Sequence, residues 1–274
     1  MTTASAAASY PLARERNAIL ASLLLLAAGA WALLVWRWAI MDDGDMMSLT
    51  MGMSAPLFIA IWIAMMVAMM FPTAAPMILT FARVQSNRRE QGRPFVPAWI
   101  FVGSYLVVWT LAGLVAFAAA TGIEALAGRV DWLSDNAGRI GGGVIVLAGL
   151  YQLSPLKRAC LTKCRAPHSF ILTSWRDGNW GAFRMGAEHG LFCLGCCWLL
   201  FVILFPLGMM NVGAMALITL LIFAEKSTPI GRQMATLASL GLVVFGAIVL
   251  FVPDLLPTVM SADGGQSMDG MGQM

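Results

Sequence analysis

The stretch AMMVAMMFPTAAPM, residues 64–77, decides the fold class of this chain. It lies within an apolar run, residues 57–81, that contains no charged side chain. A helix needs about 20 apolar residues to cross the hydrocarbon core of a bilayer, and this run is longer than that. Because no water satisfies backbone groups in lipid, a spanning segment of this kind is helical. The stretch therefore predicts a transmembrane helix.

The composition of the chain extends this prediction to the whole molecule. Of its 274 residues, 59% are hydrophobic and only 11% are charged. Soluble domains carry about 25% charged residues. The net charge of +3 is too small to indicate binding to nucleic acid. We therefore expect an integral membrane protein whose surroundings are lipid.

Seven segments are apolar candidates for spans, so we predict an all-α bundle of about seven transmembrane helices. They are Ala18–Trp36, Leu57–Phe81, Ala98–Ala120, Ile140–Leu153, Phe183–Leu207, Val212–Phe223 and Ala235–Val252. The fourth and sixth segments are shorter than the usual length of about 17–25 residues. Either flanking residues extend them or they re-enter the membrane from one side.

The basic residues predict the orientation of this bundle. If the N-terminus is cytoplasmic, all 17 lysines and arginines except Arg37, Arg129 and Arg139 fall on the cytoplasmic side. Cytoplasmic loops of membrane proteins carry such an excess of positive charge. We therefore predict a multi-pass membrane protein, with its N-terminus inside and its C-terminus outside. The chain divides into a disordered start (1–13), a transmembrane helical domain (14–253) and an outer tail rich in Met, Asp and Gly (254–274).

The fifth segment carries the residues with the clearest chemistry. It contains EHGLFCLGCCW, residues 188–198, and ionisable side chains within a span usually face the interior of the bundle. The histidine and the first two cysteines are spaced i, i+4 and i+7, so they share one helix face, and the third cysteine lies one turn from the first. Imidazole and thiolate ligands suit Cu(I) or Zn(II), although one helix cannot close such a site alone. The candidate ligands are Glu188, His189, Cys193, Cys196 and Cys197.

A structural interpretation of the same segment stays open. Free cysteines pack in cores as small hydrophobic residues. Glu188 has Arg184 one turn earlier as an ion-pair partner. Gly190 and Gly195 flank the cysteines and would let a neighbouring helix approach closely. Close packing and metal binding are therefore alternatives for these residues.

The methionines of the second segment form two stripes. Residues four apart stack on a helix, which pairs the first methionine with the third and the second with the fourth. Prolines at 72 and 76 then disturb the helix and free backbone carbonyls. Thioethers are soft, neutral ligands that select Cu(I), but methionine is also a flexible filler of helix contacts. The candidate ligands are Met65, Met66, Met69 and Met70.

Two segments on the predicted outer side share a composition of methionine, aspartate, glycine and serine. They are residues 41–53 and 260–274, and neither contains a basic residue. Short-spaced thioethers and negative charge would suit a low-affinity segment that collects cations. The alternative is a disordered linker.

The segment after the fourth span holds two further cysteines. Cys160, Cys164 and His168 are four residues apart and would stack on one helix face, although Pro167 interrupts the last step. Cysteines in a reducing cytoplasm usually remain plain thiols. This loop is therefore either a metal acceptor or sensor, or a pair of plain thiols.

Motifs of other protein classes are absent or weak. The sequence has no phosphate-binding loop, dinucleotide fingerprint or nucleophile elbow. Glu225 and Lys226 stand at the cytoplasmic end of the sixth segment, where we expect them to pair with each other and end the helix. None of these motifs predicts an enzyme.

Several motifs occur together in this chain. They are MMVAMMFP (65–72) with Pro76, YQLSPLKRACLTKCR (151–165), LGCCW (194–198), GMMN (208–211) and EK (225–226). In this combination the chain resembles a bacterial family of predicted metal-binding integral membrane proteins, long classed as a domain of unknown function. The resemblance covers roughly residues 57–250. It implies metal binding and no particular activity. Together with the predicted spans, it leads us to predict a multi-pass protein of a bacterial inner membrane.

We therefore predict that the protein binds, delivers or transports Cu(I), with zinc as the alternative metal. Outer methionines would collect the ion, and the second and fifth spans would hold it. Cys160 and Cys164 would accept it on the inner side, where a metallochaperone or a membrane complex is the expected partner. Two alternatives differ in class. One is a membrane thiol-disulfide oxidoreductase that uses Cys193 and Cys196 as a CxxC pair, and the other is a non-catalytic assembly subunit.

Overall fold

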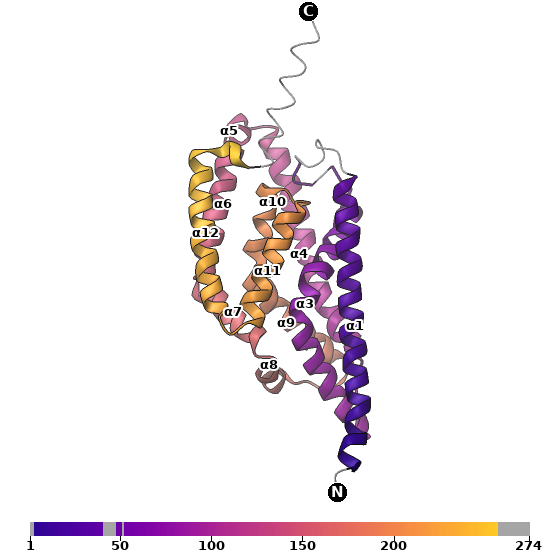
Figure 1. Ribbon diagram of the computed structural model, residues 1–274. Helices are drawn as coiled ribbons and strands as arrows, with labels where there is room; N and C mark the ends of the chain where they lie inside the picture. The colour runs from indigo at the N-terminus through magenta and orange to yellow at the C-terminus, as the bar shows by residue number, and fades with distance from the viewer. Residues whose placement is uncertain (1–2, 41–47, 51, 257–274) are drawn as a thin grey trace, which may run out of the picture.

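The computed structural model describes residues 3–40, 48–50 and 52–256, and within these residues it contains helices and no strand (Figure 1). The elements are α1 (Thr3–Ala39), α3 (Ala55–Glu90), α4 (Ala98–Ala127), α5 (Asp131–Asp135), α6 (Ala137–Gln152), α7 (Pro155–Arg165), α8 (Pro167–Ser174), α9 (Gly178–Val202), α10 (Leu204–Leu207), α11 (Val212–Ser227), α12 (Gly231–Phe251) and the 3-10 helix η1 (Pro253–Leu255). The predicted all-helical class is confirmed. Since α1 begins at Thr3, it includes most of segment 1–13, and disorder of that segment stays a prediction.

Among the described residues, five helices are long and apolar enough to cross a membrane. They lie at Ala13–Ala39, Ala55–Glu90, Ala98–Ala127, Gly178–Leu207 and Gly231–Phe251. A sixth candidate is the pair α6 and α7, which bend by 61° at a short break. The remaining predicted span is α11, whose 16 residues extend about 24 Å against a hydrocarbon core of about 30 Å. The count of seven spans stays a prediction.

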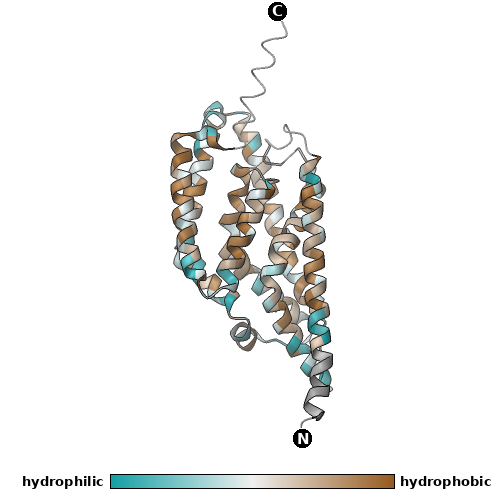
Figure 2. Cartoon of the chain, viewed as in Figure 1, coloured by the Kyte–Doolittle hydropathy of each residue, from teal (hydrophilic) through white to brown (hydrophobic). Residues whose placement is uncertain are grey.

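Hydrophobic residues make up most of the length of the long helices (Figure 2). Large apolar side chains such as Leu25, Val115 and Phe251 are 72%, 71% and 86% exposed. Hydrophilic residues gather at the ends of the bundle, including the end that holds α7 and α8 (Figure 2). An apolar outer surface of this extent is compatible with a multi-pass membrane protein.

α3 lies in the core of the bundle, where it packs against α1 and α4. Its four methionines at residues 65–70 are entirely buried. The two prolines lie inside the helix and do not end it. Pro72 lacks the N–H that would bond to the carbonyl oxygen of Ala68, and the indole N–H of Trp31 on α1 donates to that oxygen at 3.1 Å instead. The carbonyl that proline frees thus gains a partner from a neighbouring helix.

Glycines bring α9 close to α4 and α7. A Cβ atom at Gly190 would lie 3.0 Å from Val108 Cβ on α4. A Cβ atom at Gly195 would lie 2.7 Å from Cys160 Sγ on α7. Larger residues here would push the helices apart. Both glycines therefore admit a neighbouring helix, in agreement with the sequence analysis.

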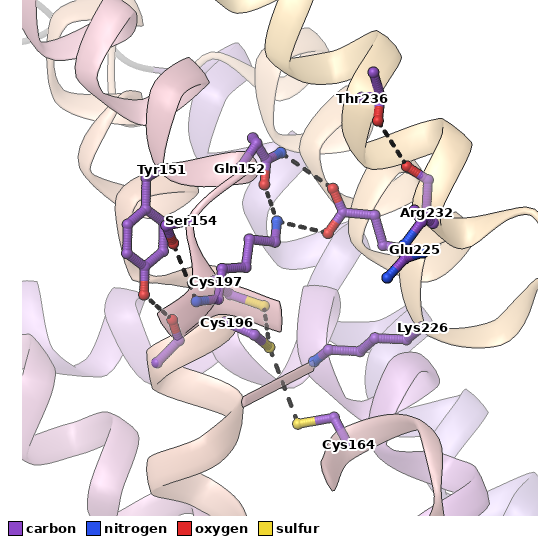
Figure 3. Close-up of polar contacts among 12 residues, drawn as sticks. Tyr151, Gln152, Ser154, Cys164, Cys196, Cys197, Glu225, Lys226, Arg232 and Thr236 are labelled. Carbon is purple, nitrogen blue, oxygen red and sulfur yellow. Dashed lines mark hydrogen bonds and ion pairs between the residues drawn. The ribbon is translucent and has the colours of Figure 1, made fainter. Parts of the chain in front are cut away.

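Buried charges attach α7 to the end of α11. Lys157 Nζ lies 2.7 Å from a carboxylate oxygen of Glu225, and both side chains are 1% exposed. Gln152 donates to the same carboxylate at 3.1 Å and accepts from Lys157 (Figure 3). The expected pairing of Glu225 with Lys226 is therefore wrong. Adjacent residues of a helix point in different directions, and each of these two finds its partner on another helix.

Candidate metal centre

Three helices bring five sulfur atoms together inside the bundle. Cys164 Sγ of α7 lies 4.0 Å from Cys196 Sγ of α9, which lies 3.3 Å from Cys197 Sγ (Figure 3). Cys193 Sγ of α9 lies 4.0 Å from Met70 Sδ of α3. The Cys193 thiol also lies near the thiols of Cys164, Cys196 and Cys197. We refer to these five residues, Met70, Cys164, Cys193, Cys196 and Cys197, as the sulfur cluster.

The cluster is buried on its α9 side and half-buried on its α7 side. Cys193, Cys196 and Cys197 are 1% exposed or less, whereas Cys164 is only partly covered. All five cysteines of the chain are free thiols. Cys164 is therefore the residue of the cluster with the most exposed surface.

Among the residues that the structure describes, two polar side chains form hydrogen bonds with the Cys193 thiol. The Lys226 ammonium of α11 donates a hydrogen bond to Cys193 Sγ at 3.0 Å. The Tyr105 hydroxyl of α4 lies 3.1 Å from the same sulfur. A cation beside a cysteine favours the thiolate, which is the form that binds metal and acts as a nucleophile. Among the described residues, four helices besides α9 itself, namely α3, α4, α7 and α11, thus contribute to the surroundings of this one sulfur.

The distances between the sulfur atoms indicate which kind of metal ion the cluster can bind. Two sulfurs at about 2.3 Å from one metal ion lie about 3.8–4.6 Å apart, between tetrahedral and linear geometry. The Cys164–Cys196 and Cys193–Met70 separations of 4.0 Å fall in this range, and the Cys196–Cys197 separation of 3.3 Å does not. Within residues 3–256, as far as they are described, no three His, Cys, Asp or Glu side chains are grouped so that they could hold a metal ion. The donor set therefore fits a soft ion held by few ligands, such as Cu(I), better than a tetrahedral ion.

His189 shares the buried face of α9 but makes no hydrogen bond through Nδ1 to any described residue. Its ring is 3% exposed and packs against Tyr105 at 5.6 Å, Phe170 at 5.7 Å and Phe101 at 6.0 Å between centroids. Buried polar atoms in proteins almost always have a hydrogen-bond partner. Because His189 lies one turn from Cys193, binding of a metal ion by Nδ1 would explain why this atom has none among the described residues. Glu188 accepts a hydrogen bond from Ser174 on α8 at 3.3 Å.

Several predicted ligands lie outside the sulfur cluster. Met65, Met66 and Met69 are entirely buried in the core around α3. In the described part of the chain, the hydrogen bond seen from a cysteine thiol to a methionine of this helix goes to Met70. Cys160 is half-buried beside Gly195. His168 is exposed on α8, whereas the cysteines with which its spacing grouped it lie on α7. Most of the outer methionine segments lie outside the described residues.

Sequence reasoning missed Tyr105 and Lys226 as members of the site. Tyr105 stands alone in a long apolar segment and belongs to no motif. Lys226 carried a usable signal, because an ionisable residue at the edge of a span is costly unless it has a partner. Its neighbour Glu225 was the obvious partner in sequence, which concealed the contact with Cys193.

Comparison with known proteins places the chain in a family. No curated protein and no solved structure matches the chain. The family described as "PpoB2: Copper chaperone" matches residues 59–249, nearly the range over which the chain resembles predicted metal-binding membrane proteins. The match covers well over half of the chain and includes the whole sulfur cluster. The chain therefore belongs to the PpoB2 copper chaperone family.

Proposed function

We propose that this protein is a membrane-embedded carrier that binds Cu(I) as cargo in the sulfur cluster and passes it to a partner. The observation that carries the proposal is the convergence of one thioether and four free thiols from α3, α7 and α9. Thiolate and thioether sulfurs are soft ligands, and Met70 supplies its sulfur without deprotonation. The description of the family as copper chaperones supports the choice of metal.

The exposure of the cysteines suggests where copper is exchanged. Cys164 is half-buried on α7, while Cys193, Cys196 and Cys197 are enclosed. A thiol at the edge of a buried cluster can share the ion with an incoming thiol before the inner ligands release it. We assign this exchange role to Cys164, with a metallochaperone or a membrane complex as its partner.

The membrane arrangement that we propose has seven spans in a bacterial inner membrane. α6 and α11 would be its two short spans, with the N-terminus inside and the C-terminus outside. This places α7 and α8 on the cytoplasmic side, together with the basic residues of the loops between spans. The outer methionine segments would then collect copper on the opposite side.

The first experiment measures the copper content of the full-length protein in detergent. The protein is loaded with Cu(I) under reducing conditions and analysed by elemental mass spectrometry. We expect near-stoichiometric copper in the wild type and loss of it in the variant Cys193→Ser/Cys196→Ser/Cys197→Ser. Cys160→Ser is the matched control, because this thiol lies beside the cluster and should be dispensable for binding.

Two outcomes would contradict the proposal. Equal copper content in the wild type and the triple variant would show that the ion is not bound by the sulfur cluster. A wild type that takes up no Cu(I) would end the carrier hypothesis altogether. Reversible formation of a Cys193–Cys196 disulfide in such a copper-free protein would favour the thiol-disulfide oxidoreductase instead.

A further inference from the structure

Lys157 on α7 and Lys226 on α11 have charges that are compensated differently. Lys157 is paired with the Glu225 carboxylate at 2.7 Å, so this buried pair carries no net charge. Lys226 donates to Cys193 Sγ at 3.0 Å, and none of the three ion pairs seen among the described residues includes it. In Figure 3, Glu225 points toward Gln152, while Lys226 points toward the cysteines. Within the described residues, the Lys226 ammonium therefore adjoins the sulfur cluster without a carboxylate at ion-pair distance to balance its charge.

This charge has a consequence for the ion that the cluster prefers. Cu(I) bound by two thiolates forms a complex with a single negative charge, which the Lys226 ammonium neutralises. Zn(II) bound by two thiolates is already neutral, so the same ammonium leaves the buried site with an excess positive charge. A third thiolate would restore the balance for zinc. No three such groups are grouped as ligands in the described residues, so the third thiolate would have to move into place.

We propose that Lys226 sets the selectivity of the cluster for a monovalent soft cation over a divalent one. This inference rests on the proposed function, since it concerns the same sulfurs. Tyr105 allows the effect of charge on Cys193 to be distinguished from the effect of a hydrogen bond. Its hydroxyl lies 3.1 Å from Cys193 Sγ, at nearly the same distance as the Lys226 ammonium, but it carries no charge. Lys226 acts through charge, whereas Tyr105 contributes a neutral contact to the same sulfur.

The test compares Cu(I) and Zn(II) affinities of the full-length protein by competition with a chromophoric chelator for each metal. Lys226→Met and Lys226→Gln remove the charge, and Lys226→Arg keeps it. We expect the ratio of Cu(I) to Zn(II) affinity to fall by about ten- to a hundredfold in the two neutral variants. Lys226→Arg should retain most of the wild-type ratio. Tyr105→Phe, the matched control, should weaken both metals similarly and leave the ratio unchanged.

An unchanged ratio in both neutral variants would overturn the inference, as would an equal fall in Tyr105→Phe. Two neutral variants of different polarity are used, so that the test can still be made if one of them does not fold. Elution of each variant as a single species in detergent shows that it is folded. A wild type that binds no Cu(I) would instead be a failure of the proposed function. A wild type that binds Cu(I) with a ratio independent of Lys226 would refute the selectivity role alone.

Discussion

Met70 and Met66 are both entirely buried on α3, but they have different neighbours. Met70 Sδ lies 4.0 Å from Cys193 Sγ, while Met66 packs in the apolar core. We predict that Met70→Leu lowers the affinity for Cu(I) by about tenfold or more, as a weakened metal site typically does. Met66→Leu should leave the affinity unchanged. Competition against a Cu(I) chelator measures both variants.

Stability provides the control for this comparison. Exchange of methionine for leucine in a core usually costs less than about 1.5 kcal/mol, so both variants should fold. Equal Cu(I) affinities for Met70→Leu and Met66→Leu would show that the methionine of the cluster is only a packing residue. That result would favour the interpretation of α3 as a helix filled with flexible side chains.

At the scale of residues, spacing along one helix was enough to predict which side chains share a helix face. The i, i+4, i+7 pattern of α9 placed His189, Cys193 and Cys196 on a shared face, and all three are buried. The pattern could not predict contacts with Tyr105 or Lys226, because these depend on how α4 and α11 pack against α9. Long-range packing also selects one methionine of the α3 stripes as a neighbour of the cysteines.

α7 is held against α11 by its buried ion pair, which suggests a prediction about the element as a whole. Lys157→Met leaves the Glu225 carboxylate buried without its cation. Removal of one partner of a buried pair typically costs about 3–5 kcal/mol. We therefore expect Lys157→Met to lower the thermal unfolding temperature in detergent clearly. The Cu(I) affinity should fall with it, because Cys164 lies on the same helix.

The double variant Lys157→Met/Glu225→Leu shows whether the loss of stability comes from the unpaired charge of Glu225 or from altered packing. Replacement of both members of a buried pair by apolar residues is often neutral or stabilising. We expect the double variant to recover most of the unfolding temperature that Lys157→Met loses. If both variants unfolded at the same lowered temperature, the ion pair would not be what holds α7 in place.

The long helices were predictable because continuous apolar runs leave few alternatives in a membrane. α7 and α8 were described from sequence only as an inner loop, although a local signal was present. Ser154 followed by Pro155 is a typical helix start, and Ser154 Oγ accepts the backbone N–H of Lys157 at 3.1 Å. The contact of Cys164 with α9 was not predictable, because it depends on the 61° bend between α6 and α7.

At the scale of the whole molecule, the number of spans depends on the shortest helices. α6 and α11 each contain 16 residues, and each extends about 24 Å. A short helix can still span if the bilayer thins around it or if flanking residues reach the interface. Length and composition therefore leave α11 undecided, and the distribution of positive charge is the argument that favours a full span.

Labelling of single cysteines at the two ends of α11 tests this arrangement in the full-length chain. Gly213 is exposed near its start, and Ile230 is 48% exposed just after its end. If α11 crosses the membrane, a membrane-impermeant maleimide should label Gly213→Cys in intact spheroplasts and Ile230→Cys only after lysis. The wild type gives the background from its own cysteines. Labelling of both positions from the same side would make α11 re-entrant. It would also remove the charge distribution as an argument for seven spans, since Arg232 and Lys226 would no longer be separated from the outer side by a complete helix.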